Sequence, residues 1–169
     1  MDTGYWAGRK NIILISLMSG MGNYAADRLT KIIAVETLGD GRTRAYLGGT
    51  VLLHLAENTG AFLSMGSTWP VALKYLVLLI IPIGICLYGL FHCFFKETDR
   101  IRAALIAAIV GGGMGNLIDR LMNDFTVIDF LNFGIGSLRT GILNVADLSV
   151  TFGALALLVY EWAKGRKAA

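Results

Sequence analysis

The chain has 169 residues, of which 55% are hydrophobic and only 16% are charged, and its formal net charge is +3. This balance excludes an ordinary soluble domain and predicts a mainly α membrane protein, organised as a single integral membrane domain over residues 1–169. The basic residues lie at the ends of apolar segments, so nucleic acid is not an expected partner, and the isolated cysteines and histidines predict neither a metal site nor another cofactor.

Four apolar segments predict four transmembrane helices, at about residues 11–30, 71–95, 103–119 and 143–162. The first is the weakest, because Asp27, Arg28 and Lys31 interrupt it and should lie near a membrane interface. Gly111 and Gly115 in the third segment are four residues apart, a spacing that lets two membrane helices approach closely.

Two longer connections separate these helices. Residues 36–70 predict a small extracytoplasmic β-sheet or cradle, with strands at 42–47 and 50–57 joined by Gly48-Gly49. A sheet of this size is not stable alone, so it should rest on the helices or on lipid. Residues 119–142 are expected to form a second extended connection.

The distribution of lysine and arginine predicts the orientation of the chain. Eight of the 15 such residues are concentrated in the two termini and the 96–102 loop, whereas the others are spread through the long connections. Because short segments carry the topological signal, both termini should be cytoplasmic and both long connections should lie outside.

Polar residues gather at the predicted outer ends of the last two helices. Asn116 and Arg120 share one helix face at i, i+4, and Asn144 and Asp147 share another at i, i+3. The connection between the two helices carries Asp129. We therefore expect Asp129 and Asp147 to lie close together, although capping and mutual satisfaction of polar groups at the interface would explain the same pattern.

A close pair of carboxylates in a low dielectric releases its protons in separate steps, so one group can act as a base and the other as an acid. Such a pair can activate water for attack on an amide. The sequence has no H-E-x-x-H or G-x-S-x-G motif that would indicate a zinc peptidase or a serine hydrolase. The alternative is a small proton- or ion-coupled transporter, but a transporter would place its acids at mid-membrane.

Two further motifs have local explanations as well as functional ones. Asp27 and Lys31, at i, i+4, could anchor the end of the first helix by an ion pair or could brace the site. Asn58, followed by Gly60 and Ala61, could form an ordinary turn or could present a polar loop to a substrate backbone.

Five blocks in order resemble the bacterial lipoprotein signal peptidases, the signal peptidase II family. The blocks are D-R-L-T-K at Asp27–Lys31, N-T-G-A-F at Asn58–Phe62, G-N-L-I-D-R at Gly115–Arg120, V-I-D-F at Val127–Phe130 and N-V-A-D at Asn144–Asp147. Each block is weak alone, but together they span most of the chain.

The resemblance implies an intramembrane aspartic endopeptidase of the bacterial inner membrane, with its site near the extracytoplasmic face. It implies cleavage of prolipoproteins just before a diacylglyceryl-modified lipobox cysteine, and inhibition by globomycin-type cyclic peptides. Membrane lipids would surround the enzyme, and nothing requires more than a monomer. Asp129 and Asp147 would be catalytic, and eight residues would shape or support the site: Asp27, Lys31, Asn58, Gly60, Ala61, Asn116, Arg120 and Asn144.

Overall fold

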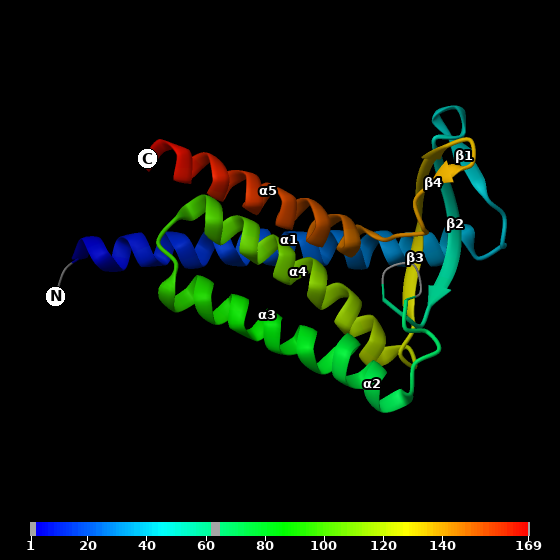
Figure 1. Cartoon of the computed structure of the whole chain (residues 1–169), viewed down its shortest axis with the longest axis horizontal. Helices are drawn as coiled ribbons and strands as arrows, with labels where there is room; N and C mark the ends of the chain where they lie inside the picture. Colours follow the sequence, from blue (N-terminus) through cyan, green and yellow to red (C-terminus); the bar gives the residue numbers. More distant parts are fainter. Residues whose placement is uncertain (1–2, 62–64, 169) are drawn as a thin grey trace.

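A computed structural model describes residues 3–61 and 65–168. Its long helices run side by side, and a small sheet lies across one end of them (Figure 1). The outermost described parts of α1 and α5 lie together at the opposite end (Figure 1). The architecture therefore places both ends of the chain on one side of the helices and the sheet on the other.

The first helix, α1, runs without interruption over Thr3–Leu38, which is longer than predicted. At about 1.5 Å per residue its 36 residues extend about 54 Å, well beyond a hydrocarbon core of about 30 Å. Helix α4 (Arg100–Met122) packs between α1 and α5 (Val145–Ala168). The far end of α1 therefore reaches the sheet and brings its charged residues there.

The second apolar segment is helical from Val71 to Lys96 but not uniformly α. It consists of α2 (Val71–Tyr75), a π-helical turn η3 (Leu76–Ile80), α3 (Ile81–Phe91) and a second π-helical turn η4 (His92–Lys96). Pro82 follows the first π turn, where its missing N–H and its ring disturb the regular hydrogen-bond ladder.

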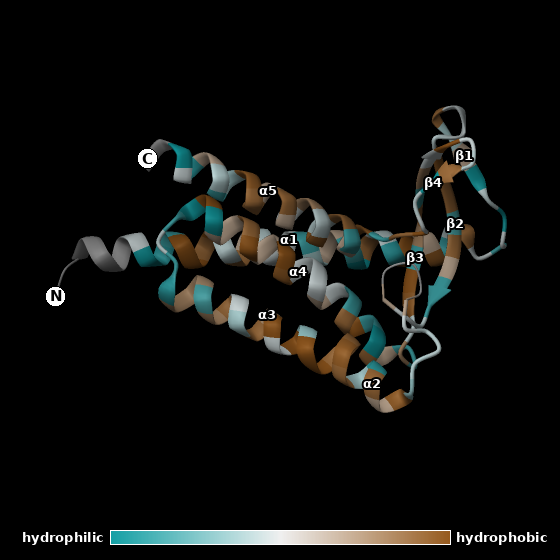
Figure 2. Cartoon of the chain, in the orientation of Figure 1, coloured by the Kyte–Doolittle hydropathy of each residue, from teal (hydrophilic) through white to brown (hydrophobic). Residues whose placement is uncertain are grey.

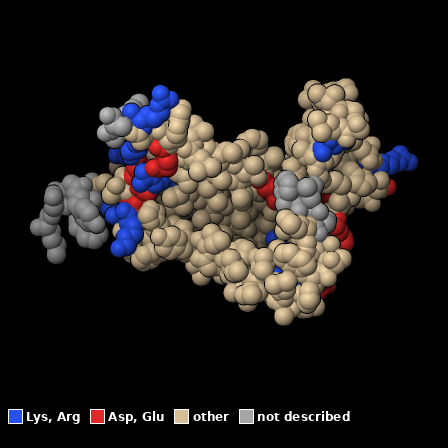
Figure 3. Space-filling model, in the orientation of Figure 1, with Lys and Arg blue, Asp and Glu red and all other residues tan. Residues whose placement is uncertain are grey.

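Within the described residues, three helical segments are long and apolar enough to cross a membrane: Val71–Lys96, Arg100–Met122 and Val145–Arg166. They coincide closely with the predicted spans at 71–95, 103–119 and 143–162. Figure 2 shows their apolar middles, and Figure 3 shows Lys, Arg, Asp and Glu gathered at the two ends of the molecule with an uncharged band between. α1 is not among the three, so the fourth span stays a prediction.

The sheet is antiparallel throughout, in the order β1-β2-β3-β4. β1 (Arg44–Tyr46) and β2 (Val51–Asn58) are the predicted hairpin, slightly shifted. Gly48 and Gly49 have φ of 64° and 88° in the turn between them, a conformation that glycine adopts without strain.

The second connection is more ordered than expected. α4 continues to Met122, and β3 (Val127–Ile135) and β4 (Leu138–Arg139) follow. The 36–70 region therefore supplies only half of the sheet. In the run V-I-D-F-L-N-F, the polar Asp129 and Asn132 interrupt the apolar pattern of a strand, and its partner β2 lies about 70 residues earlier, beyond any local signal.

Small residues set the spacing of the helices. A Cβ atom on Gly111 would overlap the backbone of Gly20 in α1, and one on Gly115 would overlap the Asp27 carboxylate. A Cβ atom on Gly112 would come 2.8 Å from the Ala146 carbonyl oxygen. The predicted close approach at Gly111 and Gly115 is confirmed, and it brings the outer ends of α1, α4 and α5 together.

Candidate active site

The predicted site residues converge where the helices meet the sheet. Asp129 comes from β3, Asp147 from the first turn of α5, and Asn116 from α4. Asn58 is the last residue of β2, and it lies opposite Val127 in the sheet register. Side chains from two helices and two strands therefore meet at one point.

Asp147 is fixed by the start of its own helix. The Asp147 N–H donates to the Asn144 side-chain oxygen at 2.9 Å, and the Asp147 carboxylate accepts from the Asn144 N–H at 3.1 Å. This reciprocal pair is a capping box, with Asn144 as the N-cap and Asp147 three residues later. The carboxylate thus lies at the positive end of the α5 dipole, which favours its ionised form.

Asp129 has a different environment. Its side chain is 2% exposed and accepts amide hydrogen bonds from Asn58 at 2.9 Å and Asn144 at 2.7 Å. Burial raises the pKa of Asp129 to about 6, and the nearby charge of Asp147 acts in the same direction, against the lowering effect of the two amides. Of the two carboxylates, Asp129 lacks a helix terminus to stabilise its negative charge.

Two asparagines connect the carboxylates. The Asn144 amide donates to the Asn116 side-chain oxygen at 2.9 Å as well as to Asp129. The Asn116 amide in turn donates to Asp147 at 2.9 Å. Lys31 donates to the same Asn116 oxygen at 2.8 Å, which fixes the amide so that its NH₂ group faces Asp147.

Behind this network lies a buried ion cluster. Lys31, 1% exposed, contacts Asp27 at 2.8 Å and Asp119 at 2.7 Å. Arg28 also pairs with Asp119. Asp27 accepts a hydrogen bond from the Ala146 N–H at 2.9 Å, so the cluster joins α1, α4 and the start of α5. Lys31 reaches the network through Asn116, and within the described part of the chain no hydrogen bond or ion pair joins Asp27 or Lys31 to Asp129.

The loop after β2 forms the remaining wall. Asn58 closes a turn by accepting from the Gly60 N–H at 2.9 Å and donating to the Ala61 carbonyl at 3.1 Å. Arg120 donates to the Gly60 carbonyl at 2.7 Å. Gly60 and Ala61 therefore act through their backbones. The Arg120 Nε is buried and has no hydrogen-bond partner among the described residues.

Asp129 and Asp147 line a common cavity of about 20 Å³, together with Asn58, Asn116 and Arg120. That volume is sufficient for about one water molecule. A wider groove of about 430 Å³ also reaches Asp147 and Arg120, and its other walls are the apolar residues of η3, α4 and α5, such as Leu78, Leu117 and Val150. Figure 3 shows an uncharged hollow among the helices.

Comparison with known proteins shows the family of this chain. The family model described as Signal peptidase (SPase) II matches residues 21–163. The chain belongs to the signal peptidase II family. It is therefore a peptidase, and the family membership decides against the transporter alternative.

Relatives in this family are similar over most of the chain. A lipoprotein signal peptidase of Borrelia turicatae is 34% identical over 155 residues, covering 89% of this chain and 88% of that protein. The corresponding protein of Mycobacterium leprae is 36% identical over 140 residues, covering 79% of this chain and 64% of its own length. A solved bacterial membrane enzyme, 23% identical, has the same fold with a TM-score of 0.74 over 88% of this chain and 87% of that one.

Two residues of the site network were not predicted to belong to it. They are Arg28 and Asp119, and the contacts of Asp119 with Arg28 and Lys31 depend on α1, about 90 residues earlier in the chain than the fully buried Asp119. Its position three residues after Asn116, on nearly the same helix face, was the available signal. Within the described residues, no group of His, Cys, Asp and Glu is arranged to hold a metal ion.

Proposed function

We propose that this peptidase removes signal peptides from diacylglyceryl-modified prolipoproteins, cleaving before the lipobox cysteine, with Asp129 and Asp147 as its catalytic pair. The observation that carries the proposal is the shared cavity, which both carboxylates line and which has room for about one water. The names of the relatives in Borrelia and Mycobacterium support lipoproteins as the substrates.

The surroundings of the two carboxylates suggest which of them starts as the base and which as the acid. Asp147, at the helix N-terminus and with a backbone N–H on its carboxylate, is the base. Asp129, whose pKa burial raises to about 6, holds the proton and is the acid. Asp147 takes a proton from water as the water oxygen bonds to the scissile carbonyl carbon, and Asp129 gives its proton to the carbonyl oxygen.

The resulting gem-diol then collapses. The C–N bond breaks as Asp147 passes its proton to the departing nitrogen, while Asp129 takes one back from a hydroxyl group. The products are a carboxylic acid and an amine, and both aspartates return to their starting states. No metal or side-chain nucleophile takes part.

The supporting residues act by position. Asn116 and Asn144 orient the carboxylates, and Asn58 holds Asp129 from the loop side. Arg120 lines the groove, its Nε has no partner within residues 3–61 and 65–168, and it supplies a donor for a substrate carbonyl. The apolar groove that leads to Asp147 suits a substrate that arrives from the bilayer with its acyl chains.

We also propose that α1 is the fourth transmembrane helix of one integral membrane domain over residues 1–169. Its close packing along α4 supports this, although charged residues lower its mean hydropathy. The basic termini and 96–102 loop support a cytoplasmic location for that end of the bundle, with the sheet and site at the extracytoplasmic face of a bacterial inner membrane. Monomeric function, contact with membrane lipids and inhibition by globomycin-type peptides belong to the same proposal.

The test uses a synthetic prolipoprotein peptide with and without the diacylglyceryl group, incubated with the purified enzyme in liposomes. Mass spectrometry should find a lipidated product that begins at the cysteine, and no product from the unlipidated peptide. Cleavage elsewhere, or equal cleavage of both peptides, would overturn the proposed specificity.

A further inference from the structure

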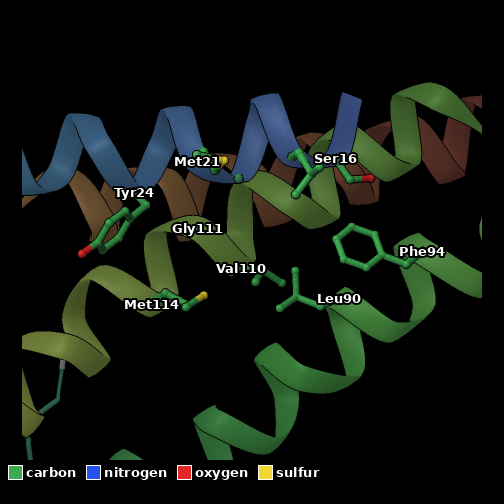
Figure 4. Close-up of a pocket in the computed structure, with 10 residues that line it drawn as sticks. Ser16, Met21, Tyr24, Leu90, Phe94, Val110, Gly111 and Met114 are labelled. Atoms are coloured by element: carbon green, nitrogen blue, oxygen red, sulfur yellow. The ribbon is translucent and has the colours of Figure 1, made fainter. Parts of the chain in front are cut away.

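A second apolar groove lies on another side of α4. Its volume is about 140 Å³, and its lining includes Leu17, Met21 and Tyr24 of α1 and Leu90 and Phe94 of the second helical segment. Figure 4 shows α1 on one side of it and the second helical segment on the other. Val110, Gly111 and Met114 of α4 form its floor. It shares no lining residue with the groove that reaches Asp147. The substrate groove and this one are therefore separate.

A second pocket, with charged residues in its lining, lies further along α1. Arg28 lies one helical turn after Tyr24, and it lines a pocket of about 220 Å³ with Ile32, Val35 and Glu36. The outward-facing residues Leu17, Met21, Tyr24 and Arg28 follow each other at three- and four-residue steps, which places them on one face of the helix. That face changes from apolar to charged as α1 approaches the sheet.

Three charged residues line this pocket, and Lys31 is already paired with Asp27 and Asp119, whereas Arg28 and Glu36 have bonding capacity to spare. The Arg28 guanidinium uses one nitrogen for Asp119, its side chain remains 29% exposed, and its other N–H groups have no partner among the described residues. Glu36 is exposed and makes no ion pair within the described part of the chain. A cation and an anion that line one pocket, about two helical turns apart on α1, are complementary to a zwitterion.

We propose that one phospholipid with an ethanolamine headgroup binds along this face of α1. An acyl chain lies in the groove of Figure 4, the phosphate accepts from Arg28, and the ammonium faces Glu36. The acyl chain would lie within the uncharged band of the molecule, and the end of α1 would contact the headgroup. Phosphatidylglycerol has the phosphate but no ammonium, so its negative charge would be repelled by the Glu36 carboxylate.

The test is native mass spectrometry of the full-length protein, extracted mildly from liposomes of equal phosphatidylethanolamine and phosphatidylglycerol. The wild type should retain one phosphatidylethanolamine in preference to phosphatidylglycerol. Arg28→Gln should lower this occupancy about tenfold, because it removes a charge-assisted hydrogen bond. Glu36→Gln should abolish the preference between the two lipids.

Leu17→Trp fills the groove without touching the ion cluster, so it tests the acyl-chain contact if Arg28→Gln fails to fold. It should also lower the occupancy. Met18→Trp is its control, since Met18 is 68% exposed and lies outside the groove. Arg42→Gln, an exposed arginine near the sheet, is the control for charge. Both controls should bind lipid as the wild type does.

Equal retention of the two lipids by the wild type, or unchanged retention by Leu17→Trp, would overturn the proposal. A third outcome would assign the groove to substrate acyl chains: Leu17→Trp would then raise the KM for the diacylglyceryl peptide and leave phospholipid retention unchanged. That result would also overturn the proposal.

Discussion

Asn116 and Asn144 are hydrogen-bonded to each other at 2.9 Å in an orientation that points an amide N–H of each toward a different carboxylate. Lys31 fixes this polarity from one end, and the capping box fixes it from the other. The two asparagine amides therefore present a hydrogen-bond donor to each of the carboxylates of Asp129 and Asp147, and they present an acceptor oxygen to neither.

This relationship predicts the effect of shortening one asparagine. Asn116→Ala removes the donor to Asp147 and leaves the Lys31 ammonium without its amide partner. A hydrogen bond to a charged group is worth about 1.5–3 kcal/mol, so kcat should fall roughly 10- to 100-fold. The rate of cleavage of a lipidated peptide in detergent measures this fall in kcat. Asn123→Ala, at the end of α4, is the control and should keep its activity.

The environment of Asp129 predicts a pH dependence of stability. Its pKa is raised from 3.8 to about 6 in the folded protein, so folding favours the protonated acid. The corresponding stabilisation is complete below the unfolded pKa, near 4, and is lost as the pH rises through about 6. It amounts to about 3 kcal/mol over that window.

Reversible unfolding in mixed micelles measures this contribution between pH 4 and pH 7. Other carboxylates titrate in the same range, so the comparison with Asp129→Asn is the decisive one. The free energy of unfolding of the wild type should decline more steeply with pH than that of the variant, which cannot ionise. Parallel curves for the two proteins would show that Asp129 is not a buried acid of raised pKa.

The packing of α1 on α4 predicts that alanine substitutions at two glycines have opposite effects on stability. In Gly115→Ala the new Cβ would overlap the buried Asp27 carboxylate, so the variant should lose about 1–3 kcal/mol of stability. In Gly22→Ala the new Cβ meets nothing within 4 Å, so the helix should gain about 0.5–1 kcal/mol. Thermal unfolding followed by tryptophan fluorescence compares the two. Similar shifts for both variants would contradict the close approach of α1 and α4.

The sequence predicted those parts of the fold that depend on local signals. Long apolar runs indicated the three spans, and the i, i+3 spacing of Asn144 and Asp147 indicated that they share a helix face. The sequence did not indicate that β3 completes the sheet, because its pairing with β2 is non-local and Asp129 interrupts its apolar pattern. It also left Asp119 outside the predicted site, since the pairing with Arg28 arises only when α1 packs on α4.

The most direct test of the central claim is the cleavage rate of Asp129→Asn and Asp147→Asn with a diacylglyceryl-modified prolipoprotein in liposomes. Each isosteric change removes one proton-transfer group and should lower kcat about 10²- to 10⁴-fold. Circular dichroism should show native helix content, and Asp124→Asn, at an exposed residue, should remain fully active. Wild-type cleavage by either folded variant would contradict the aspartate-pair mechanism.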